Sequence, residues 1–220
     1  MLSKNINFKN FKKTKIRSRL RLIYRNLIDK RTDKKNLINS FTKSFSYSFN
    51  KKQITKFKKY KVFLIYGMGG SSLGAKAIYD FMYDGIKKNF YFFDNIDSKN
   101  HKIKTRKKTL NIIISKSGNT LETVVNDNIF STRDKLYITE NRNSYLKNLA
   151  LKLKSEIIEH KNYIGGRYSV LSEVGMLPAE LMGLKSDKFK RFDKLILKKQ
   201  FVESLLINVN MLYDLVKRKK

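Results

Sequence analysis

The chain of 220 residues contains no cysteine, no tryptophan and a single proline. The absence of cysteine excludes disulfide bonds, thiolate metal sites and a cysteine nucleophile. It also fits a reducing compartment, so we expect a cytoplasmic protein. No apolar run approaches the roughly 18 residues that a membrane helix needs, and the basic N-terminus lacks the apolar stretch of a secretory signal. We therefore expect no membrane partner.

Acidic residues are also scarce. The chain has 18 of them and 49 lysines and arginines, which gives a net charge of +31. Such a charge ordinarily suggests nucleic acid as a partner. The basic residues, however, spread from Lys4 to Lys220 among abundant Asn, Ile, Tyr and Phe, which is the composition that an A+T-rich genome encodes. We interpret the charge mainly as compositional drift at solvent-exposed positions. Nucleic-acid binding remains the minority hypothesis. A positive field would still attract a phosphate ester.

Short runs of β-branched and aromatic residues alternate with stretches of helical periodicity. The predicted strands are Val62–Tyr66, Phe90–Phe93, Leu110–Ile114, Lys135–Thr139 and Ile157–Glu159. The predicted helices are Ser72–Tyr83, Leu121–Phe130, Tyr145–Leu153, Ser172–Met182 and Phe201–Val216. Nearly uniformly apolar strands separated by helices indicate a parallel sheet that is covered on both faces. The predicted fold is an α/β three-layer sandwich with a five-stranded parallel sheet.

Three segments divide the chain in this interpretation. Residues 1–58 form a basic helical lead-in, in which Leu20, Leu22, Ile23 and Leu27 line one helix face. Residues 59–184 form the α/β domain, and residues 185–220 form C-terminal helices. In open parallel sheets the ligand crevice lies beyond the carboxyl ends of the strands, where the strand order reverses. The loops that follow strands are therefore the candidate ligand-binding segments.

The first such loop is Gly67-Met68-Gly69-Gly70-Ser71-Ser72-Leu73-Gly74. Its glycines allow close approach of backbone to a ligand, and the helix start that follows offers free N–H groups to an anion. Dinucleotide binding is disfavoured because Ser72 stands where the third glycine of that fingerprint would fall. No lysine follows at the spacing of a nucleoside triphosphate loop.

The second loop is Ser115-Lys116-Ser117-Gly118-Asn119-Thr120, which opens a predicted helix. A phosphate dianion needs several converging donors, and hydroxyl groups with helix-end amides supply them. The alternative is an ordinary capping turn with Thr120 as the N-cap. Capping rarely needs so many hydroxyl groups, so we favour a phosphate site.

The third loop, Gly165-Gly166-Arg167, combines a tight turn with a guanidinium group. Arginine stays cationic at any working pH and suits a developing oxyanion. The alternative is a surface arginine with a solvated head group, which is a fair default in so basic a chain.

Together these loops resemble those of the glucose-6-phosphate isomerase family. Similar motifs in that family are Gly-Ile-Gly-Gly-Ser-x-Leu-Gly, Ser-Lys-(Ser/Thr)-x-x-Thr-x-Glu and Gly-Gly-Arg-(Tyr/Phe)-Ser, which match residues 67–74, 115–122 and 165–169 here. Asn95-Ile96-Asp97 is similar to the family's Asn-Val-Asp, and residues 170–178 continue the third motif as in bacterial members. The resemblance implies a sugar isomerase domain of flavodoxin-like topology.

The resemblance also implies roles for individual residues. Ser115, Lys116 through its backbone, Ser117 and Thr120 would hold the phosphate, and Gly70 and Ser71 would line the sugar site. Arg167, with Gly166, would stabilise an enediolate. The implied activity is the interconversion of glucose 6-phosphate and fructose 6-phosphate in glycolysis and gluconeogenesis, without cofactor or metal. The implied partners are the phosphorylated hexose and a second copy in a homodimer, or a complementing C-terminal half.

The family's base Glu, ring-opening His and later Lys lie C-terminal to the third motif, beyond the segment that corresponds to this chain. We therefore expect a fragment that lacks the base, binds phosphohexose weakly and turns it over little or not at all. Glu122 and Glu173 are expected to open helices, and His101 and His160 match no catalytic position. The alternative is a stand-alone phosphosugar-binding module or regulator.

Overall fold

The computed structural model describes residues 15–96, 108–129 and 134–218, which form two compact units. The larger unit, Ser46–Phe189, contains the sheet, and the smaller one contains the described residues up to Phe45 and from Lys190 onward. The sequence-predicted positions Asp97, His101 and Phe130 lie outside the described residues.

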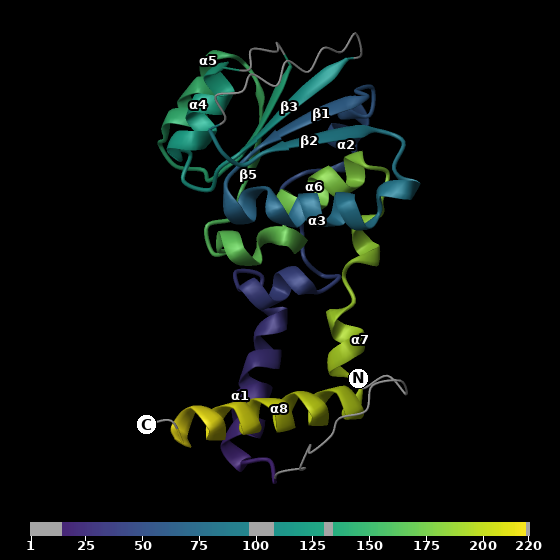
Figure 1. The fold of residues 1–220 in the computed structure, drawn as a ribbon, viewed down its shortest axis with the longest axis vertical. Helices are drawn as coiled ribbons and strands as arrows, with labels where there is room; N and C mark the ends of the chain where they lie inside the picture. The colour runs from purple at the N-terminus through teal and green to yellow at the C-terminus, as the bar shows by residue number, and fades with distance from the viewer. Residues whose placement is uncertain (1–14, 97–107, 130–133, 219–220) are drawn as a thin grey trace. The chain divides into compact units, whose positions relative to one another are not determined.

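The larger unit is built on a five-stranded parallel sheet (Figure 1). Its strands are β1 (Val62–Tyr66), β2 (Asn89–Phe93), β3 (Thr109–Ile114), β4 (Lys135–Thr139) and β5 (Glu156–Glu159). They are ordered β2-β1-β3-β4-β5. This order is the flavodoxin-like one, and it reverses direction between β1 and β3. The predicted fold class is therefore confirmed.

Helices cover both faces of this sheet, as Figure 1 shows. The described α-helices of this unit are α2 (Lys51–Phe57), α3 (Leu73–Phe81), α4 (Leu121–Ile129), α5 (Tyr145–Lys152) and α6 (Glu173–Leu181). Alternate residues of each strand point to opposite faces. In β1, Phe63 and Ile65 therefore join the core under α2, α3 and α6, whereas Leu64 joins the core under α4 and α5.

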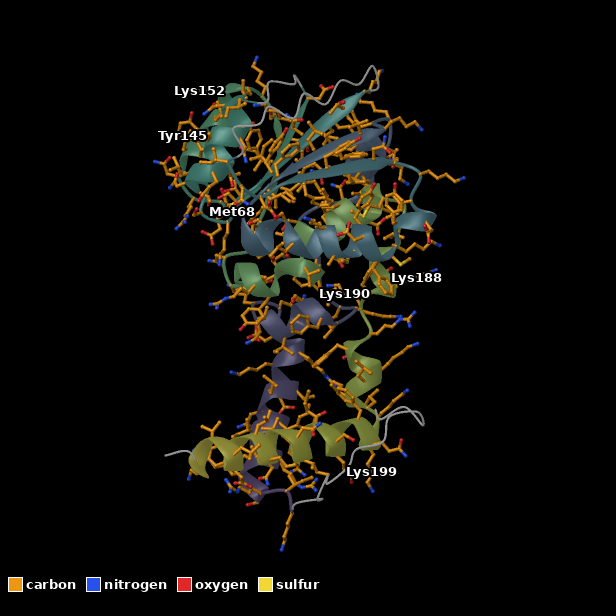
Figure 2. The ribbon with its side chains drawn as sticks, in the orientation of Figure 1. Met68, Tyr145, Lys152, Lys188, Lys190 and Lys199 are labelled. Carbon is orange, nitrogen blue, oxygen red and sulfur yellow. The ribbon has the colours of Figure 1, made fainter. Side chains whose placement is uncertain are left out.

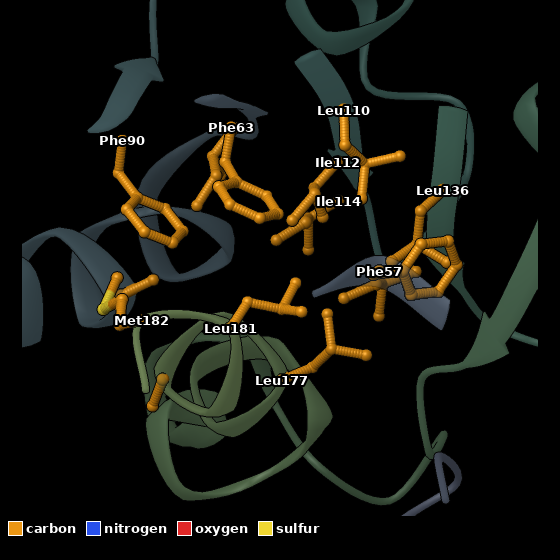
Figure 3. Close-up of a cluster of buried hydrophobic side chains, with 14 of the residues drawn as sticks. Phe57, Phe63, Phe90, Leu110, Ile112, Ile114, Leu136, Leu177, Leu181 and Met182 are labelled. Carbon is orange, nitrogen blue, oxygen red and sulfur yellow. The ribbon is translucent and has the colours of Figure 1, made fainter. Parts of the chain in front are cut away.

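The core on the α6 side is the larger of the two. Leu177 and Leu181 of α6 point at the strands, where Ile112 and Ile114 of β3 meet them (Figure 3). Eight of the nine residues of α6 are buried, which is what a helix packed between other elements requires. The Ser172 hydroxyl accepts from Val174 N–H at 3.4 Å and caps this helix, which begins one residue after the predicted start at Ser172.

The smaller unit contains α1 (Ser18–Asp29), α7 (Phe192–Ile196) and α8 (Lys199–Arg218). Helix α1 lies within the predicted basic lead-in of residues 1–58, and within this unit Tyr24 Oη donates to the carbonyl of Ile196 at 3.3 Å. Throughout the described ranges, no helix combines the length and the apolar character that crossing a membrane demands.

Candidate active site

Three loops meet at the carboxyl-terminal edge of the sheet. They follow β1, β3 and β5 and are the loops that the sequence predicts. Met68, after β1, and Tyr145, after β4, mark this edge in Figure 2. Because β1 and β3 are neighbours where the strand order reverses, the first two loops flank the place where parallel sheets bind ligands.

Two glycines of the first loop pack against the end of β3 and against the third loop, where a side chain would not fit. A Cβ atom on Gly67 would lie 3.0 Å from the carbonyl oxygen of Ile114, the last residue of β3. A Cβ atom on Gly70 would lie 2.0 Å from the carbonyl oxygen of Gly166. The Ser169 hydroxyl donates to the carbonyl of Gly70 at 3.1 Å and ties the same two loops together. Glycine at these positions is therefore a packing requirement.

Hydroxyl groups converge in the second loop. Ser115 Oγ lies 2.9 Å from Thr120 Oγ1, and Ser117 Oγ lies 3.4 Å from each of them. Gly118, at φ +67°, adopts the left-handed conformation that turns the chain back, and its N–H donates to Ser115 Oγ at 3.1 Å. The Thr120 hydroxyl thus contacts the other two hydroxyl groups, beside the N-terminus of α4, where an anion is favoured.

The connection between β4 and α5 holds this loop in place. The carbonyl of Lys116 accepts from Glu140 N–H at 3.2 Å, and the carbonyl of Gly118 accepts from Leu146 N–H at 2.9 Å. Asn119 Oδ1 accepts from Tyr145 N–H at 2.8 Å, at the first residue of α5. The backbone of the second loop is therefore held by hydrogen bonds to the β4–α5 region in the absence of a ligand.

A polar cavity of about 400 Å³ opens over the second loop. It is lined by Ser71, Lys116, Ser117, Thr120, Glu140 and Arg142. Four of these are sequence-predicted site residues. Ser115 is 2% exposed and lies behind the lining, where it supports Thr120.

Two lining residues, Glu140 and Arg142, are not among the sequence-predicted site residues, and the sequence favours a strand-end surface charge for Glu140. Glu140 Oε1 lies 3.4 Å from Lys116 Nζ, and Glu140 Oε2 lies 3.1 Å from Arg142 Nε. The sequence signal that could have found them is their position directly after β4, at the same edge of the sheet as the predicted loops.

A second cavity, of about 760 Å³, adjoins the first loop on the other side. It contains the sequence-predicted Gly70, Gly166 and Arg167, and its remaining lining is apolar. The structure therefore distributes the predicted residues over two cavities, and of the consecutive residues Gly70 and Ser71 the first lines the larger cavity and the second the smaller one. The smaller cavity is the better anion site, because its hydroxyl and cationic groups match a phosphate and the apolar walls of the larger one do not.

Other candidate groups lie away from both cavities. His160 is 1% exposed, its Nδ1 contacts the carbonyl of Lys161, and burial lowers its pKa. Glu173 is fully buried in the first turn of α6, and burial raises its pKa. Among the described residues, no group of His, Cys, Asp or Glu side chains could hold a metal ion.

Comparison with known proteins points to one family. The phosphoglucose isomerase family model matches residues 24–217. The glucose-6-phosphate isomerase of Methanocaldococcus jannaschii is 32% identical over 187 residues, covering 76% of this chain and 46% of that protein. That of Mycoplasmoides gallisepticum is 30% identical over 211 residues, covering 83% of this chain and 48% of that protein.

Among solved structures, a hypothetical protein from Thermus thermophilus superposes with a TM-score of 0.69 at 22% identity, over 88% of this chain and 52% of that one. This likeness supports the fold. The chain spans about half the length of the two curated relatives described above. With the family model matching nearly its whole length, this chain belongs to the phosphoglucose isomerase family.

Proposed function

We propose that this chain binds the phosphate group of glucose 6-phosphate and fructose 6-phosphate and takes part in their interconversion. The observation that carries the proposal is the convergence of the Ser115, Ser117 and Thr120 hydroxyl groups beside Lys116, on a cavity at the edge where parallel sheets bind ligands. The names of its relatives, which are glucose-6-phosphate isomerases, supply the sugar.

In this proposal each loop has a separate task. Ser115, the backbone of Lys116, Ser117 and Thr120 hold the phosphate. Gly70 and Ser71 line the sugar site between the two cavities. A glycine at position 70 leaves backbone, rather than side chain, against the substrate.

Arg167, with Gly166, stabilises the enediolate that forms when the proton on C2 of the aldose leaves. That proton returns on C1 to give the ketose. Negative charge develops on the sugar oxygens only during this transfer, so an arginine there lowers the barrier more than it tightens ground-state binding.

We assign no base for this proton transfer among the described residues. Glu140 is the one carboxylate among the residues that line the two cavities, and both of its oxygens already face cations, Lys116 and Arg142. We propose that a segment outside the described residues supplies the base.

The phosphate assignment is tested by calorimetric titration of the whole chain with glucose 6-phosphate and with glucose. We expect saturable binding of the phosphate ester and none of glucose. The double variant Ser117→Ala/Thr120→Ala removes two hydrogen bonds to a charged group, at about 1.5 kcal/mol or more each, so affinity falls roughly 100-fold.

The matched control is Thr32→Ala/Thr55→Ala, which removes two exposed hydroxyl groups that donate only to local carbonyls. It keeps the wild-type affinity. Circular dichroism melts of both variants separate lost binding from lost folding. Equal affinities of wild type and Ser117→Ala/Thr120→Ala would refute the phosphate site.

A further inference from the structure

Arg142 occupies a position on the polar cavity that the family motifs do not predict. It lies between β4 and α5, and its side chain lines the cavity together with Ser117 and Thr120. Its Nη2 donates to the carbonyl of Ser117 at 3.4 Å, and its Nε lies 3.1 Å from Glu140 Oε2. The guanidinium is thereby placed beside the loop whose hydroxyl groups converge.

Glu140 aligns this arginine with Lys116. The Glu140 side chain is only 11% exposed, and each of its oxygens faces one of the two cations. Two cations and one carboxylate leave a formal charge of +1 on the cavity lining, so the carboxylate holds the cations in place without cancelling them. A phosphate dianion entering the cavity would therefore meet a net positive wall.

The two cations differ in how firmly they are held. Lys116 Nζ donates to the carbonyl of Asn162 at 2.7 Å besides facing Glu140, and its side chain is 31% exposed. The Arg142 side chain is 55% exposed. A guanidinium group carries five N–H donors, and the two contacts described above use one on Nε and one on Nη2. Arg142 is the cation that can turn toward a ligand with donors to spare.

We propose that Arg142 is a phosphate-binding residue, which donates to the phosphate oxygens across the cavity from Ser117 and Thr120. The inference rests on the proposed function, because it presumes that a phosphate enters this cavity. Charge-assisted hydrogen bonds from arginine are among the stronger polar contacts in proteins. The competing explanation is that Arg142 only fastens its own loop to Ser117 and Glu140.

Titration of the full chain with glucose 6-phosphate and with inorganic phosphate tests the proposal. We expect Arg142→Gln to lower the affinity for both ligands about tenfold or more, with an unchanged melting temperature. Arg142→Lys, which keeps the charge but not the planar fork, recovers part of the affinity. Raising the salt concentration weakens wild-type binding more steeply than that of Arg142→Gln, because one cation fewer faces the phosphate.

The matched control is Lys147→Gln, which removes the same charge from a neighbouring position in α5. Lys147 Nζ donates to Asn141 Oδ1 at 2.7 Å, and Lys147 is not among the residues lining the cavity. We expect its affinities to stay within about twofold of wild type. If Lys147→Gln and Arg142→Gln lowered the affinity equally, the loss would come from the overall positive charge of the chain. That result would overturn the inference.

The two proposals fail in different ways. Wild-type affinity in Arg142→Gln, or a lowered melting temperature with unchanged affinity, overturns the role of Arg142 and leaves the phosphate site intact. Failure of the wild-type chain to bind glucose 6-phosphate removes the proposed function, and the role of Arg142 falls with it.

Discussion

Gly70 is where the first and third loops come closest. The 2.0 Å that would separate a Cβ atom at this position from the carbonyl oxygen of Gly166 is far below any real contact. The obstacle is backbone, which cannot swing aside as a flexible side chain would. The position of Arg167 therefore depends on a residue in another loop that lacks a side chain.

We predict that Gly70→Ala lowers the free energy of unfolding by about 2 kcal/mol or more, because the two loops must separate. Gly85→Ala is the control, since a Cβ atom there meets nothing within 4 Å. That substitution should be neutral or stabilise by a few tenths of a kcal/mol, through the reduced entropy of the unfolded chain. Urea denaturation of both variants measures the difference, and similar stabilities would contradict the close contact between loops.

At the scale of elements, α6 is tied to the segment before α2 by a buried carboxyl group. Glu173 Oε1 accepts from the N–H of Ser48 at 3.0 Å and lies 3.2 Å from its hydroxyl oxygen. Glu173 Oε2 has no hydrogen-bond partner among the residues that the structure describes, and the side chain is fully buried. Burial is the main cause of the raised pKa of Glu173, and the hydrogen bonds and the positive charge of Lys161 oppose it.

A carboxyl group whose pKa is raised by folding favours the folded state while it is protonated. Its contribution is complete below the unfolded-state pKa, near the usual 4.5, and is lost as the pH rises through the folded-state pKa. We predict that Glu173→Gln, which stays neutral, gains stability relative to wild type as the pH rises from 4 to 7. Urea denaturation across this pH range measures the difference in free energy of unfolding between the variant and wild type. Glu159→Gln, at an exposed position in β5, is the control. A stability difference between Glu173→Gln and wild type that does not vary with pH would contradict the prediction.

At the scale of the whole molecule, the dominant feature is the charge. The 49 basic and 18 acidic residues leave +31, and like charges at this density repel one another in any compact state. The buried cores offset this repulsion, and both sides of the sheet are filled with apolar side chains. Salt shortens the range of the repulsion and so favours the folded chain.

We predict that the midpoint of thermal unfolding rises between about 20 and 300 mM sodium chloride, where the screening length falls from well above to below 10 Å. The variant Lys51→Gln/Lys52→Gln removes two exposed charges from the first turn of α2 and should show a shallower rise. Calorimetric melts measure both slopes. A midpoint that falls with salt would show that attractive ion pairs outweigh the repulsion.

Much of the fold could be predicted because its signals are local. The buried strands are contiguous apolar runs, and the predicted Val62–Tyr66 and Lys135–Thr139 agree with β1 and β4 in both bounds. Several other ends shift by one or two residues, as at β3, which begins at Thr109 rather than Leu110. A terminal residue joins a strand through pairing with its neighbour, as Thr109 does with Val62, and a single sequence does not contain that pairing.

The sequence by itself determined the strands, the helices that alternate with them and the three loops, because each depends on residues that are neighbours along the chain. Only the tertiary structure decided that Ser71 joins Ser117 and Thr120 in one cavity while Gly70 and Arg167 line another. The tertiary structure also places Glu140 and Arg142, which follow β4 and belong to no recognised sequence motif, at the polar cavity. Parallel pairing sets the carboxyl ends of distant strands side by side, so these contacts depend on register across the sheet and not on spacing in the chain.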